Sequence, residues 1–114
     1  MEEMSYEKQK LLICYMLSNA DLFIKANPIL KSSFFDPRLK SAIEFIQSFY
    51  GLYKGVPTTA QLFAETDIKI EVNSTSLTNQ ELRYAEDTLE KFLQFKTIEQ
   101  AIFQSVDLLH NDVR

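Results

Sequence analysis

Glycine is scarce in this chain, since Gly51 and Gly55 are the only two among 114 residues. The Gly-x-x-x-x-Gly-Lys-[Ser/Thr] loop that holds nucleotide phosphates is absent, and two glycines cannot build another loop of that kind. We therefore expect no ATP hydrolysis, no catalytic residues and no cofactor in this chain. Three prolines and 46% hydrophobic residues exclude a disordered or low-complexity chain and fit one globular domain.

The chain has one cysteine, Cys14, and one histidine, His110. A single cysteine cannot close an internal disulfide, which favours a cytoplasmic location. Cys14 lies in the apolar run from Leu11 to Leu17, so a small buried residue is favoured over a reactive thiol. A nucleophile–base pair of Cys14 and His110 has no supporting motif, and we expect no metal site at His110.

The charge pattern argues against nucleic acid and membranes as direct partners. The net charge is −4, and basic residues lie singly or beside acids, as Lys91 does after Glu90. A phosphate-binding domain is expected to carry a basic patch instead. No apolar run approaches the ~20 residues of a membrane span. Adjacent acids such as Glu86 and Asp87 fit a solvated helix face better than acid–base catalysis.

Residues that favour the starts and ends of helices recur through residues 5–66. Ser5 can cap a first helix that ends near Asn19, and a second helix is expected over 21–26, before the break at Pro28. A long third helix follows Asp36-Pro37, and Gly55 is expected to end it. Its apolar face holds Leu39, Ala42, Ile43, Ile46, Phe49, Tyr50 and Tyr53.

A fourth helix begins at Thr58, where Thr58 and Gln61 have the spacing of a capping box. Leu62 and Phe63 are expected to point inward from it. Residues 67–77 are then expected to form a loop in which Ile68 and Ile70 pack onto the bundle.

Residues 78–110 are the most helical part of the sequence, and Thr78 with Glu81 opens them as a second capping box. Leu82, Ala85, Leu89, Phe92 and Leu93 form one apolar stripe, and Ile98, Ala101, Ile102, Val106 and Leu109 form another. On one continuous helix the two stripes would lie on different sides, with the change around 94–97. Thr97 and Gln100 form a third potential capping box there. Neither Gly nor Pro marks a turn there, so the residues alone allow either a hairpin or one continuous helix.

Two aromatic residues, Phe95 and Phe103, lie off these stripes. Exposed aromatic side chains that lie close together favour a protein interface. Simple core packing is the alternative for both of these side chains.

An ordered series of these signals resembles a known family. It includes Phe34-Phe35-Asp36-Pro37 before the long helix, then Tyr53-Lys54-Gly55-Val56-Pro57-Thr58, and Glu90-Lys91-Phe92-Leu93-Gln94 near the end. The series, over most of residues 9–110, resembles the amino-terminal domain of DnaB-like replicative DNA helicases, with the T-even-type phage helicases as the nearest group.

The resemblance implies an all-α fold for residues 1–114 as a single domain: a compact bundle over 5–66, a loop over 67–77 and a helical hairpin over 78–110. It implies an assembly role, in which such domains pair through their hairpins, form a collar in a hexamer, and dock primase or a helicase loader in DNA replication. The interface residues expected on this basis are Leu89, Phe92, Phe95, Ile98, Ile102, Phe103 and Val106.

Two other functions fit the same residues. The expected helicase linker and motor do not occur before Arg114, so the chain is either an excised domain or a stand-alone phage protein. A stand-alone protein would copy the collar domain and regulate a helicase, loader or primase. The second alternative is a small helical regulator unrelated to replication, or a minor enzyme that uses Cys14.

Overall fold

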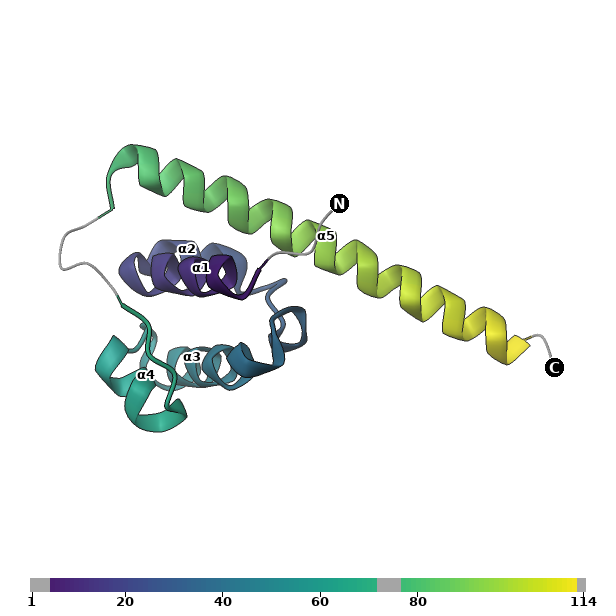
Figure 1. Ribbon diagram of the computed structural model, residues 1–114, viewed down its shortest axis with the longest axis horizontal. Coiled ribbons are helices and arrows are strands. Elements are labelled where there is room, and N and C mark those ends of the chain that lie inside the picture. Colours follow the sequence, from purple (N-terminus) through teal and green to yellow (C-terminus); the bar gives the residue numbers. More distant parts are fainter. Residues whose placement is uncertain (1–4, 72–76, 113–114) are drawn as a thin grey trace.

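Every regular element in the described part of the chain is helical, which confirms the all-α fold class. The computed structural model describes residues 5–71 and 77–112, and the side chains of 5–71 and 77–103. Its elements, in order (Figure 1), are α1 (Tyr6–Ser18), α2 (Ala20–Ala26), η1 (Ser32–Phe34), η2 (Pro37–Leu39), α3 (Lys40–Tyr53), α4 (Thr59–Thr66) and α5 (Asn79–Asp112), where η marks a 3-10 helix.

The helices begin where the sequence places capping residues. The Ser5 hydroxyl accepts a hydrogen bond from the Lys8 amide at 3.2 Å and opens α1. Thr58 and Gln61 exchange hydrogen bonds of 2.9 and 3.1 Å as a capping box before α4. Thr78 and Glu81 do the same before α5, at 3.0 and 3.1 Å. These three predictions are confirmed because each cap satisfies amides within one turn of its own residue.

Both ends of α3 differ from expectation in detail. Asp36 caps the 3-10 helix η2 rather than α3, and α3 begins at Lys40. The helix ends at Tyr53 because Lys54, with φ of 60°, turns into the left-handed region and donates its amide to the Tyr50 carbonyl at 2.8 Å. The prediction that Gly55 ends the helix is wrong, since neither glycine has a positive φ.

One apolar core joins all five α-helices. Ile13, Phe23, Ile43, Ile46 and Leu62 are all fully buried in it. Ile70, from the segment after α4, is also buried at 4% exposure, as the sequence predicts, and Ile68 packs against the cluster. Phe63 is 49% exposed, so its predicted inward orientation is wrong.

The helices form a layered bundle from which α5 projects. Figure 1 shows α1 and α2 between α5 on one side and α3 with α4 on the other, and α5 contacts both α1 and α2. The 34 residues of α5 rise about 51 Å along its axis. This length largely sets the longest dimension of 57 Å, against 31 and 24 Å for the other two. The carboxyl-terminal part of α5 therefore extends beyond the bundle (Figure 1).

The expected hairpin over residues 78–110 is not formed, because Asn79–Asp112 is one continuous helix. Thr97 lies inside that helix, and its hydroxyl donates to the Leu93 carbonyl one turn earlier, at 2.7 Å. It therefore does not form the predicted third capping box with Gln100. The apolar side of α5 changes near 94–97, and a helix without Gly or Pro continues unbroken through this segment.

A candidate protein-interaction surface on the last helix

The described residues hold no group of three or more His, Cys, Asp or Glu side chains that could bind a metal ion. The side chain of His110 lies outside those described. Over the same described ranges, no helix is both long enough and apolar enough to cross a membrane.

Cys14 on α1 is half-buried and tied to a neighbouring segment. Its thiol donates a hydrogen bond to the Glu71 carbonyl, with 3.0 Å between sulfur and oxygen. Burial raises the pKa of the Cys14 thiol, and the nearby Glu81 carboxylate adds to the rise. A raised pKa lowers the fraction of reactive thiolate, which fits a packed side chain rather than a nucleophile.

The most exposed apolar side chains of α5 belong to its projecting part. Ile98 is 60% exposed, Ile102 is 57% exposed and Phe103 is 64% exposed. Each is large and apolar, and the three lie within two turns of one helix. Ile98 and Ile102 lie on the same side of the helix, and we call these two residues the α5 apolar patch.

Two different causes expose these three side chains. Ile98 lies about 180° around the helix axis from the buried Leu89, so it faces away from the bundle. Ile102 lies on the same outer side as Ile98, four residues later. Phe103 instead lies near the direction of Leu89, about 40° away, but beyond the end of the bundle. Its ring is exposed because no part of the described chain reaches that far along the helix to cover it.

A hydrogen bond marks the end of the packed part of α5. Lys31 donates from Nζ to Gln100 Oε1 at 3.0 Å, and among the described side chains this bond to the bundle lies farthest along the helix. Immediately before it, Lys96 is 7% exposed and its ammonium lies 3.3 Å from a Glu99 carboxylate oxygen.

The seven predicted interface residues do not share one environment in the structure. Leu89 and Phe92 are each 4% exposed and belong to the core, where Phe92 packs edge-to-face on Phe35 with ring centres 5.1 Å apart. Phe95 is half-buried. Ile98 and Ile102 form the exposed patch, Phe103 is exposed on another side of the helix, and the Val106 side chain lies outside the described part. Among the described members of the predicted set, Ile98, Ile102 and Phe103 are thus the exposed ones.

A second exposed apolar area at the end of α3 was not predicted from sequence. Leu52 and Tyr53 are 76% and 68% exposed. Tyr53 packs on Phe49 at 4.6 Å between ring centres, and Phe49 packs on Phe45 at 5.9 Å. The four-residue spacing of these three aromatics is a signal for such a ladder. The sequence places Phe49 and Tyr53 on the apolar face of α3 because they continue its helical spacing, and it leaves Phe45 and Leu52 outside that face.

A scan of protein-family models, a search of curated proteins and a search of solved structures each found no match to this chain. The functional assignment therefore depends on the residues and geometry above.

Proposed function

We propose that this chain is the amino-terminal assembly domain of a phage replicative helicase of the DnaB class. In this role it pairs with a second copy within a hexameric collar and offers a docking surface for primase or a helicase loader. The ordered sequence signals between residues 34 and 94 support the family, as does the all-helical bundle with a long last helix. In this proposal the single helix α5 takes the pairing role that was expected of a hairpin.

The observation that carries the proposal is the α5 apolar patch. Its two large apolar side chains, each more than half exposed, lie on the outer side of a helix that already extends beyond its own bundle. Leaving them in water loses about 25 cal/mol for each Å² of apolar surface that a partner could cover. Because a two-fold axis presents the same surface from both copies, one helix can supply both halves of such a contact.

Self-association of the chain tests the pairing. Sedimentation over a range of concentrations should show a reversible dimer for the wild type. Ile98→Ser combined with Ile102→Ser should remove it, since central apolar side chains of an interface often contribute about 2 kcal/mol or more each. Leu52→Ser is the matched control, because Leu52 is equally apolar and 76% exposed on α3.

The outcomes separate clearly. Loss of the dimer in the double variant, with unchanged helical content and an unchanged dimer in the control, supports pairing through α5. A monomeric wild type at every concentration contradicts the pairing. A dimer that survives the double variant but not the control would place the interface at the end of α3.

The second candidate is a stand-alone phage protein that carries the same surface and regulates a helicase, loader or primase. It is favoured if the α5 apolar patch binds one of those proteins more tightly than it binds a second copy. The reading frame beyond Arg114 distinguishes the two roles. A downstream Gly-rich phosphate loop supports the helicase, and a stop codon supports the regulator.

A further inference from the structure

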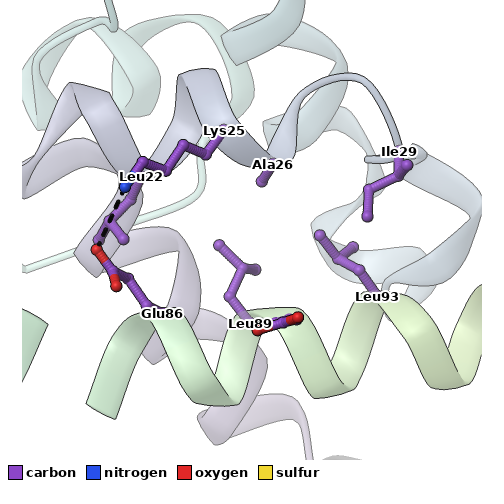
Figure 2. Close-up of a pocket in the computed structure, with 8 residues that line it drawn as sticks. Leu22, Lys25, Ala26, Ile29, Glu86, Leu89 and Leu93 are labelled. Atoms are coloured by element: carbon purple, nitrogen blue, oxygen red, sulfur yellow. Dashed lines mark ion pairs between the residues drawn. The ribbon is translucent and has the colours of Figure 1, made fainter. Parts of the chain in front are cut away.

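A groove lies between α2 and α5, on the side of α5 that faces the bundle (Figure 2). Its volume is about 310 Å³. This is at the lower end of the ~300–1,000 Å³ typical of small-molecule sites. It is therefore suited to one or two side chains of a docked segment rather than to a large ligand. The lining residues are Leu22, Lys25, Ala26, Ile29, Glu86, Leu89, Glu90 and Leu93.

The walls of the groove are apolar and rigid. Leu22 and Ala26 come from α2, and Leu89 and Leu93 come from the packed part of α5, all four within the core cluster. Ile29, in the turn after α2, is 46% exposed beside Leu93 at one end (Figure 2). The four core side chains are at most 6% exposed and form a fixed floor, so Ile29 supplies most of the apolar surface that a docked side chain could cover. Because that floor is already held in place, binding would require little ordering of the groove.

The rim of the groove is acidic on the α5 side. Glu86 pairs with Lys25 across the other end at 3.6 Å, and both side chains are largely solvated, at 44% and 72% exposure. Such a solvated pair contributes little and is easily displaced. Glu90, one turn along α5, accepts only a hydrogen bond from the Gln94 amide at 3.2 Å. It makes no ion pair with any residue in the described part of the chain.

We propose that this groove docks an amphipathic helical segment of a partner protein, with an apolar anchor on the exposed Ile29 and a Lys or Arg on Glu90. An apolar stripe in a groove with a flanking opposite charge is a common mode of peptide recognition. The groove faces away from Ile98, so a segment bound here and a second copy on the α5 apolar patch do not compete. The inference rests on the proposed function only for the kind of partner, a replication protein.

A designed probe tests the chemistry before the partner is identified. The probe is a labelled helical peptide of leucine and lysine, with leucine at i, i+3, i+4 and i+7, and its counterpart has glutamate in place of lysine. Fluorescence anisotropy at low salt should show that the lysine peptide binds about fivefold to tenfold more tightly than the glutamate peptide. In methyl NMR spectra, addition of the lysine peptide should shift the signals of Leu22, Ile29 and Leu93.

Two variants test the charged part and the apolar part of the proposed contact separately. Glu90→Lys should weaken binding of the lysine peptide by about fivefold to tenfold, whereas Glu44→Lys, the same change at an exposed site on α3, should change it less than twofold. Ile29→Ser should also weaken binding, and its partial exposure favours normal folding, which melting curves verify.

Equal binding of both peptides, equal effects of Glu90→Lys and Glu44→Lys, or NMR shifts confined to α1 and α3 would overturn the inference. Loss of self-association in Ile29→Ser would assign the groove to a second copy and would equally overturn it. Because self-association depends on Ile98 and Ile102, a failed peptide experiment with an intact dimer contradicts the groove alone. An absent dimer with normal peptide binding contradicts the pairing alone.

Discussion

The two halves of α5 both carry apolar residues at helical spacing, but these residues lie in opposite environments. In the first half, Ala85, Leu89, Phe92 and Leu93 are each at most 4% exposed against α1 and α2. In the second, Ile98, Ile102 and Phe103 are each at least 57% exposed. The helix backbone continues without a break between them. The difference therefore has two sources: Ile98 and Ile102 face away from the bundle, and Phe103 lies beyond its end. Apolar spacing along a helix does not by itself show which side chains a neighbouring element covers.

The same comparison bears on how the projecting half of α5 keeps its helical form. Isolated helices shorter than ~12–15 residues are marginal in water, and most helical stability in proteins comes from packing of an apolar face. The packed half of α5 supplies the nucleus from which the helix continues past Gln100. A second copy on the α5 apolar patch would supply the packing that the rest of the chain does not.

The largest expected effect is the difference in stability loss between alanine substitutions in the two halves of α5. Leu93→Ala should lower the free energy of unfolding by about 2–5 kcal/mol, because Leu93 is 1% exposed in the core. Ile102→Ala, measured at a concentration where the protein is monomeric, should change it by at most about 0.5 kcal/mol. Urea unfolding followed by circular dichroism measures both. Similar losses at the two sites would mean that the projecting half packs on its own bundle.

Proline substitutions, which act on the helix backbone, test the same difference between the packed and projecting halves of α5. Asp87→Pro, at an exposed position of the packed half, should cost about 3 kcal/mol or more, because proline removes a helical hydrogen bond and clashes with the preceding turn. Ala101→Pro is the matched change in the projecting half. It should lower the helical signal while leaving the melting temperature of the bundle nearly unchanged. A large drop in melting temperature for Ala101→Pro would show that the halves fold as one cooperative unit.

Acid provides a smaller perturbation that acts on the bundle alone. The Arg38 guanidinium donates to the Asp36 carboxylate at 2.9 and 3.0 Å, and with the Arg38 amide it lowers the Asp36 pKa to about 2. An unfolded Asp has a pKa of about 3.9, so this contribution to stability is complete above about pH 4 and is lost as the pH falls through about 2.

Asp36→Asn should therefore reduce the fall in melting temperature between about pH 4 and pH 2, relative to the wild type. Asp21→Asn is the control, since Asp21 is exposed at the start of α2 and its side chain makes no ion pair within the described residues. Equal effects of the two changes would show that the Arg38 contact does not set the acid response.

Local features of the fold could be predicted from the sequence. Ser5, Thr58 and Thr78 cap helices because a side-chain oxygen and an amide within three residues of it decide the contact. The buried stripes Leu39–Ile46 and Leu82–Leu93 were also predictable, since the helical period places their residues on one face. The break after α2 follows from Pro28, which cannot continue a helix.

The features that could not be predicted from the sequence depend on how far other elements of the fold extend in space. Whether α5 folds back near Gln94 is set by how far the bundle reaches along it, and no residue between 94 and 97 encodes that length. The same limit applies to the interface, because Leu89 and Ile98 belong to similar stripes but only the first meets α2. At the end of α3, Lys54 takes the left-handed position one residue before the glycine that favours it.

The central claim is that the outer side of the projecting half of α5 becomes buried against a second copy. The most direct measurement places an environment-sensitive dye on Ile102→Cys in a Cys14→Ser background, with Leu52→Cys as the control. As the concentration of unlabelled protein rises, the emission of the dye at 102 should shift to the blue, because the site leaves water, and that of the dye at 52 should not. An emission at 102 that stays unchanged while sedimentation shows a dimer would contradict the claim.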